Sequence, residues 1–259
     1  MEVLLAVVLL LFIGYLLYDE TLGDPMIEPG ARNRLCDYYA AGGVYEPLST
    51  VLARGSRLYE VHVYSDEQDH PVVAKNPLND GYNYAEDNVS FEQVCVDITN
   101  DAFPSKDPFI LSIVLHTDKA VTANECAQHL KTTVRRHLFK TDQAVARAPL
   151  DQLANKLILV SGGNVRGTEL EPLINLSWSE EDLRRLSYQQ ALHPRDEPGL
   201  VAFNRDHITL VAPETEVRTV NANPDRPKYL GCQWNLYDKS GGGFVEKPKP
   251  LRSKFLGEV

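Results

Sequence analysis

Two apolar stretches, LYEVHVYS (58–65) and FILSIVLH (109–116), decide the fold class of this 259-residue chain. Both consist mainly of residues that favour β-strands. Similar runs lie at 71–74, 157–162, 173–179, 200–204, 208–213 and 232–238. Between these runs, helix-like segments lie at 49–54, 90–102, 122–139 and 180–192. Strand-like runs that alternate with helices predict a mainly parallel α/β sheet or barrel.

Composition narrows the function classes. The formal net charge of −10, from 36 acidic and 26 basic residues, opposes a nucleic-acid phosphate backbone, so we expect no nucleic-acid partner. With 43% hydrophobic residues and only 16 Gly and 16 Pro, the chain is neither disordered nor collagen-like. Its cysteines lie far apart without a C-x-x-C pair, which predicts buried free thiols rather than a zinc ribbon.

The N-terminus reads as a membrane anchor. Residues 3–18, VLLAVVLLLFIGYLLY, carry no charge, and at about 1.5 Å per residue such a helix covers roughly 24 Å of a bilayer core. A cleaved signal peptide and a buried core helix are the alternatives, but no basic residue precedes the run and no A-x-A-like cleavage site follows it. We therefore expect a single-pass membrane protein with an anchor at 1–20, a linker leading into the barrel at 21–48 and a barrel at 49–259.

The order of the motifs is similar to that of a known family. The stretch YEPLSTVLARGSRLYEVHVYSDEQDHPVV (45–73) is followed by FEQVCVDITNDAFPSKDPFILSIVLH (91–116), and later by LSWSE (176–180), NPDRPKYLGCQWNLYD (223–238) and GGGFVEKPKPLR (241–252). These motifs resemble the X and Y halves of phosphoinositide-specific phospholipase C. The resemblance implies a distorted, compact (β/α)8 barrel of the TIM type, here preceded by the single transmembrane helix.

The resemblance also shows which parts of the family's site are missing. The family uses two histidines as acid and base and a calcium ion held by several acids, but this chain has no histidine before His62. Lys75 stands where the second catalytic histidine is expected, Val114 replaces a calcium-binding glutamate, and Leu210 replaces a phosphate-binding arginine. Only Glu60 is kept among the expected calcium ligands. Because calcium takes six to eight oxygen ligands, we expect neither calcium nor the family's catalysis.

A rebuilt site is the alternative. Glu60 and His62 lie two apart on one strand and share its inner face, and His116 ends a neighbouring strand. These three side chains are expected at the C-terminal mouth of the barrel, where barrel active sites lie. A carboxylate and two histidines favour zinc or iron over calcium. Polar mouth residues that hydrogen-bond to one another are the simpler interpretation.

Together these features predict a membrane-anchored, inactive phospholipase-C-like domain that acts as a structural or docking protein. Such anchored barrels resemble accessory proteins of large DNA viruses, which predicts a virion inner membrane or a capsid–membrane interface, with capsid proteins as partners. The alternatives are a metal-dependent phosphodiesterase or lipase built on Glu60, His62 and His116, and a module that binds lipid headgroups.

Overall fold

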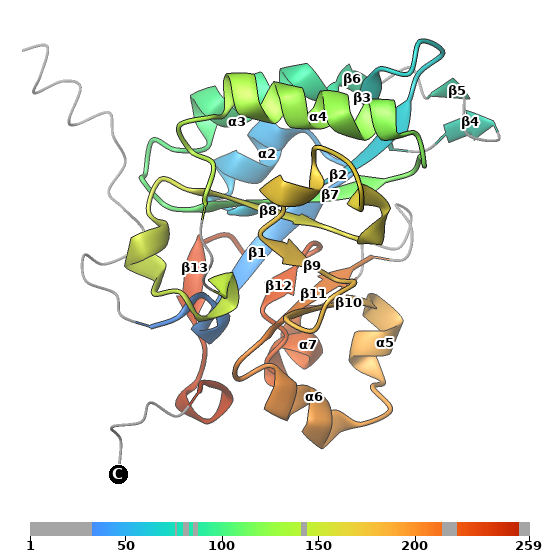
Figure 1. Ribbon diagram of the computed structural model, residues 1–259. Coiled ribbons are helices and arrows are strands. Elements are labelled where there is room, and N and C mark those ends of the chain that lie inside the picture. Colours follow the sequence, from blue (N-terminus) through green and yellow to red (C-terminus); the bar gives the residue numbers. More distant parts are fainter. Residues whose placement is uncertain are drawn as a thin grey trace, which may run out of the picture.

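Eight parallel strands form most of the sheet (Figure 1). The computed structural model describes residues 33–75, 77–79, 83–84, 88–140, 144–213 and 222–253. Among these residues the parallel strands follow the order β10-β11-β12-β1-β2-β7-β8-β9. Their bounds are β1 (Tyr38–Val44), β2 (Leu58–Ser65), β7 (Phe109–Leu115), β8 (Leu157–Ser161), β9 (Leu176–Ser177), β10 (Leu183–Ser187), β11 (Ile208–Ala212) and β12 (Trp234–Asn235).

This order is a barrel that does not close completely. The strands run around the sheet in chain order, but β9 and β10, at its two ends, are not paired with each other among the described residues. The predicted α/β barrel is therefore confirmed as a parallel, nearly closed sheet with an open seam between β9 and β10. Antiparallel additions are β13 (Phe244–Glu246) on β1, β3 (Pro71–Val73) on β2 and β6 (Val89–Ser90) on β3. A separate pair is formed by β4 (Pro77–Asn79) and β5 (Asn83–Tyr84).

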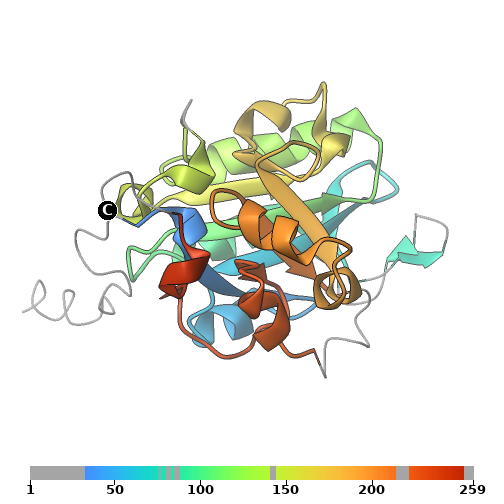
Figure 2. The same cartoon turned by 90° about the horizontal axis from the view of Figure 1, so that it is seen from below.

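Helices connect the strands. They are α2 (Leu48–Ala53), α3 (Phe91–Asp101), α4 (Ala120–Thr133), α5 (Tyr188–Leu192), α6 (Glu197–Phe203) and α7 (Asp225–Tyr229), with short 3-10 turns such as η1 (Leu35–Asp37) and η7 (Lys249–Leu251). The helix predicted over 90–102 is confirmed as α3, whose N-cap Ser90 accepts a hydrogen bond from the Gln93 amide. Figure 2 shows η1 and η7 close together, and the Lys247 amide donates to the Asp37 carbonyl between them.

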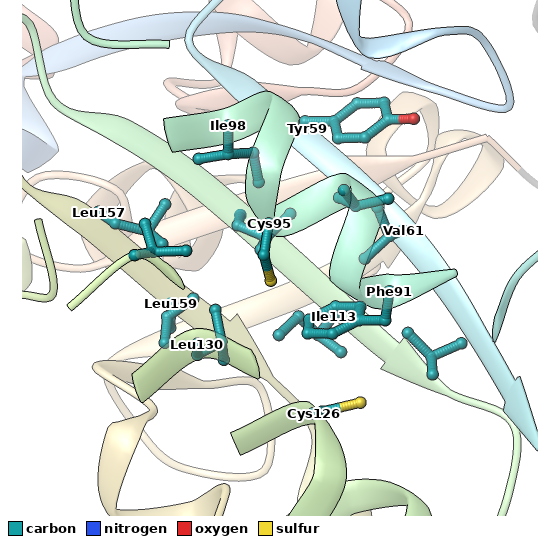
Figure 3. Close-up of a cluster of buried hydrophobic side chains, with 14 of the residues drawn as sticks. Tyr59, Val61, Phe91, Cys95, Ile98, Ile113, Cys126, Leu130, Leu157 and Leu159 are labelled. Atoms are coloured by element: carbon teal, nitrogen blue, oxygen red, sulfur yellow. The ribbon is translucent and has the colours of Figure 1, made fainter. Parts of the chain in front are cut away.

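Hydrophobic clusters lie on both faces of the sheet, and two of them surround the strands β2 and β7. One packs α3 and α4 against the outer face, with Phe91, Ile98, Ile113 and Leu130 all fully buried (Figure 3). The other fills the barrel interior, where Leu58, Ile110 and Trp234 belong to one buried cluster. Each large apolar side chain buried in this way stabilises the fold by roughly 1.5–3 kcal/mol.

Two sequence predictions were wrong. The run 200–204, expected as a strand, lies mostly in α6, and the helix expected over 180–192 is β10 followed by the short α5. The segment expected to lead into the barrel, 21–48, includes β1, so the sheet begins before residue 49. The small residues in the middle of this strand give it no apolar run that the sequence pattern could reveal. Gly42 is required there, because a Cβ at this position would lie 2.9 Å from the Leu58 side chain.

The expected membrane anchor at 3–18 lies outside the described residues. Within them, no helix is both long and apolar enough to cross a membrane.

Candidate functional site

Strands β2 and β7 place the predicted site residues in the barrel. Glu60 pairs with Ser112, and His62 pairs with Val114. Leu58 and Ile110, two residues earlier on each strand, belong to the interior cluster. Because side chains two apart on a strand share a face, Glu60, His62 and Ser112 also face the interior. His116 follows the end of β7 and is exposed at the mouth.

The Glu60 carboxylate is buried and fully engaged. The Ser112 hydroxyl donates to its Oε2 at 2.8 Å, and Nη2 of Arg185 on β10 donates to its Oε1 at 2.7 Å. Burial alone would raise the pKa of Glu60, but the hydrogen bond from His62 and the charge of Arg185 outweigh burial and lower it. Glu60 is thus an ionised carboxylate paired with an internal guanidinium.

His62 links Glu60 to His116 in a row of hydrogen bonds. Its Nε2 lies 3.4 Å from Glu60 Oε1, and its Nδ1 lies 2.9 Å from His116 Nε2. Since an ionised Glu60 accepts the Nε2 proton of His62, the His62 Nδ1 must accept the proton of His116 Nε2. Glu60 thus fixes the tautomer of His62, with its proton on Nε2. His116 then carries its own proton on Nε2, and its Nδ1 has a lone pair.

Aromatic rings hold the two histidines in place. The His116 ring stacks on Tyr64 with centroids 4.5 Å apart, and the His62 ring lies 4.8 Å from that of Tyr45. Loss of water around the His116 ring and the proximity of His62 lower the pKa of His116 to about 4. His116 is therefore neutral near pH 7.

The structure brings the three predicted residues together but does not aim them at one point. Glu60 and His116 contact opposite ring nitrogens of His62, so their ligand atoms lie on different sides of that ring. Among the described residues, no group of three or more His, Cys, Asp and Glu side chains is arranged to hold a metal ion. The zinc or iron set Glu60, His62 and His116 stays a prediction.

The residues present do not fit calcium. Two carboxylates, Glu60 and Glu46, line the cavity beside these residues, and each is paired with a guanidinium, Glu60 with Arg185 and Glu46 with Arg54. Val114 and Leu210, at positions where the family resemblance expects a calcium-binding acid and a phosphate-binding arginine, offer no polar side-chain atom, and Leu210 is fully buried. Calcium prefers six to eight oxygen ligands, which this set cannot supply.

A cavity of about 540 Å³ opens beside the row. Its lining includes Tyr45, Glu60, His62, Lys75 and Asn88. The position expected to hold the second catalytic histidine, Lys75, therefore does face this cavity, but with an ammonium in place of an imidazole.

Sequence reasoning missed Arg185 and Ser112. Arg185 lies in LRRLS (183–187), which was expected to be helical, and only its placement on β10 turns it toward Glu60. A strand could have been predicted here from the two-residue alternation, which puts Leu183, Arg185 and Ser187 on one face and Arg184 and Leu186 on the other. Ser112, directly opposite Glu60 on β7, could have been found from the strand register alone.

A family model matches part of the chain, including most of the candidate site. Residues 41–162 match the family model of the phosphatidylinositol-specific phospholipase C X domain. The resemblance read from the motifs is thereby confirmed for this region, which holds Glu60, His62, Lys75, Val114 and His116. A search of curated proteins gave no match.

Solved structures extend the likeness over the whole barrel. S. officinalis PLC21 superposes with a TM-score of 0.69 at 16% identity, covering 85% of this chain and 38% of that one. A calcium-dependent phosphoinositol-specific phospholipase C from Pseudomonas sp gives 0.54 at 13% identity, covering 87% and 97%. The Listeria monocytogenes phosphatidylinositol-specific phospholipase C gives 0.55 at 10%, covering 89% and 95%. At these sequence identities the likeness establishes the fold alone. This chain also spans less than half the length of PLC21.

Proposed function

We propose that this phospholipase-C-like barrel does not hydrolyse phosphoinositides and serves as a membrane-attached structural or docking protein. The observation that carries the proposal is the pairing of Glu60 with Arg185. A calcium-dependent phospholipase needs that carboxylate to hold a metal ion, whereas here its Oε1 is 2.7 Å from a guanidinium and its Oε2 is 2.8 Å from a hydroxyl.

The missing acid and base support the same conclusion. General acid–base catalysis contributes typically 10²- to 10⁴-fold to a rate, and it requires groups that exchange protons near neutral pH. Lys75 stands at one of the two positions where the family resemblance expects such a histidine. No histidine precedes His62, so the other expected position is empty as well.

Attachment to a membrane through residues 3–18 is supported by their uncharged, apolar sequence. A docking role is supported by a groove of about 1060 Å³ between α6, α7 and η7. Its lining includes Tyr39, Val201, Leu251 and Tyr229, whose side chain is 69% exposed. Exposed aromatic and apolar side chains are typical of protein-binding surfaces. A virion inner membrane with capsid proteins as partners is our specific prediction for this setting.

Calcium titration tests whether the pairing of Glu60 with Arg185 prevents calcium binding. Isothermal titration of the detergent-solubilised full chain with calcium is expected to show no stoichiometric binding. Glu60→Gln, which keeps the side-chain shape, is the matched control and is expected to give the same result. Stoichiometric calcium binding that Glu60→Gln abolishes would contradict the proposal.

The row of Glu60, His62 and His116 favours a second candidate, a rebuilt hydrolase for phosphodiesters or lipids. Insertion of zinc between His62 Nδ1 and His116 Nε2, now 2.9 Å apart, would leave Glu60 as the partner that orients His62. Zinc-dependent turnover that is lost in both His62→Asn and His116→Asn would favour this candidate. Binding of phosphoinositide vesicles without turnover would instead favour the lipid-headgroup module.

A further inference from the structure

A group of basic side chains lies at the end of the barrel opposite the mouth. Lys106 is in the loop between α3 and β7, while Arg135, Arg136 and Lys140 follow α4, and Lys156 directly precedes β8. Because the strands are parallel, loops that lead from a helix into a strand all open at the N-terminal end of the sheet. Figure 1 shows both loops on the left of the view. We call these five residues the basic face.

Internal contacts tie the two loops of the basic face together. The Asn155 amide donates to the Lys106 carbonyl at 2.7 Å. The ring of His137 stacks on Phe103 with centroids 3.7 Å apart, and its Nδ1 donates to the Asn155 carbonyl at 2.9 Å. Its Nε2 accepts from Arg136 Nε at 2.8 Å. This arrangement requires a neutral imidazole, and burial lowers the pKa of His137 accordingly.

The cations of the basic face are unpaired. Within the described part of the chain, none of the five has a carboxylate within 4 Å. Among the described residues of these two loops and their flanking turns, the exposed acids are Asp101 and Asp151, fewer than the five basic residues. A protein with a net charge of −10 thus concentrates positive charge at one end of the barrel. Such asymmetry favours binding to a negatively charged surface.

The chain from the expected anchor reaches the described barrel at this same end. Arg34, which immediately precedes η1 and β1, forms a β-bridge with Pro149, and the Leu150 amide donates to the Asn33 carbonyl. Residues 19–32 separate Asn33 from the apolar run at 3–18. Fourteen residues span at most about 50 Å even when fully extended. The short connection therefore keeps this end of the barrel near any membrane that holds the anchor.

We propose that the basic face binds the surface of an anionic lipid membrane, so that the barrel mouth points away from the bilayer. The proposal rests on the membrane attachment of the proposed function and adds an orientation and a lipid class to it. A basic residue close to an anionic bilayer strengthens binding about fivefold, and several such residues act together. The same orientation would keep the cavity beside Glu60 out of reach of lipids in that bilayer.

Hydrogen exchange of the full chain tests this orientation. The chain would be reconstituted into vesicles of phosphatidylcholine alone and of phosphatidylcholine with phosphatidylserine. Amides 103–108 and 134–140 are expected to exchange more slowly on the anionic vesicles, and 0.5 M salt is expected to remove the difference. Amides 163–170, in a loop on the mouth side, are expected to exchange equally on both.

Paired substitutions make the test specific. Arg135→Ser with Arg136→Ser is expected to lower the docking constant about 25-fold and to restore fast exchange, at about fivefold for each cation. Arg166→Ser with Lys239→Ser removes two exposed cations from the mouth side, neither of which pairs with a described carboxylate, and is expected to leave the slowing intact.

The outcomes separate this proposal from the one on which it rests. Equal exchange on the two kinds of vesicle, with the chain anchored in both, would overturn the orientation and reassign the basic face to an acidic protein partner. Slowing that is lost only in the mouth-side pair would also overturn it. A chain that stays free of both vesicles would contradict the membrane anchor itself, and this proposal with it.

Discussion

Arg185 stabilises a charge that the barrel could not otherwise bury. The Glu60 side chain is only 1% exposed, and that of Arg185 is 28% exposed. Removing one partner of a buried pair leaves an uncompensated charge and typically costs about 3–5 kcal/mol. Arg185→Met keeps most of the side-chain volume, so we expect it to lower the free energy of unfolding by about that amount at pH 7, as measured by urea denaturation.

The pH dependence of this loss follows from the pKa of Glu60. In the native protein that pKa is lowered, so the pair stabilises the fold above the unfolded value of about 4 and the contribution is lost as the pH falls through the folded pKa. In Arg185→Met, burial would raise the pKa of Glu60, so the deficit should shrink on acidification. Arg184→Met, which removes only an exposed contact with Phe203, should cost about 1 kcal/mol at most. Equal losses in both variants would contradict the buried pair.

His116 provides a second prediction at the residue scale. Its imidazole should titrate at about pH 4 in an NMR titration, because its ring is partly desolvated and lies beside His62. His70 should titrate above its ordinary value, because it donates to Glu125 at 2.9 Å. Because the folded pKa of His116 is lowered, its contribution to stability is present above about pH 6.5 and is lost as the pH falls toward 4. An ordinary titration of His116 near pH 6.5 would contradict the row of hydrogen bonds.

At the scale of elements, side chains span the seam that β9 and β10 leave open. The Arg185 guanidinium on β10 lies 5.5 Å from the ring of Trp178, which follows β9. Gly162, which follows β8, gives that ring its space, since a Cβ there would lie 2.5 Å from Trp178 Nε1. The seam is therefore packed by an aromatic ring and a guanidinium where backbone pairing is missing.

Gly162→Ala tests the packing at this seam. The added methyl group should displace the Trp178 ring and destabilise the protein by about 1–3 kcal/mol in urea denaturation, with a changed tryptophan emission. Gly163→Ala is the matched control, because its nearest contact is the rotatable Ser179 hydroxyl at 3.0 Å. We expect the control to cost less than about 1 kcal/mol. Identical effects of the two substitutions would show that Trp178 does not fill the seam.

At the scale of the whole molecule, the sequence predicted the barrel better than its seam. The long apolar runs that became β2, β7, β8 and β11 are buried on both faces and carry a strong periodic signal. The strand β1 has only alanine and glycine at 40–43, and β10 contains two arginines, so neither shows such a run. Their strand structure depends on pairing with distant neighbours, which local propensity does not report.

The sequence likewise predicted part of the candidate site but not the contact of Glu60 with Arg185. Glu60, His62 and His116 could be placed at the mouth because two of them share a strand and the third ends its neighbour. The role of Arg185 could not be predicted, because it lies 125 residues from Glu60 in the chain and reaches it only across the barrel interior. That single contact shows Glu60 as half of an ion pair, which the sequence did not predict.

A phosphoinositide hydrolysis assay tests the central claim most directly. The detergent-solubilised full chain would be assayed with calcium and separately with zinc, alongside Glu60→Gln and elemental analysis of the same samples. We predict no turnover above the buffer rate with either metal, no stoichiometric metal, and no difference between the two proteins. Metal-dependent turnover that Glu60→Gln abolishes would contradict the claim and would make the Glu60, His62 and His116 row an active site.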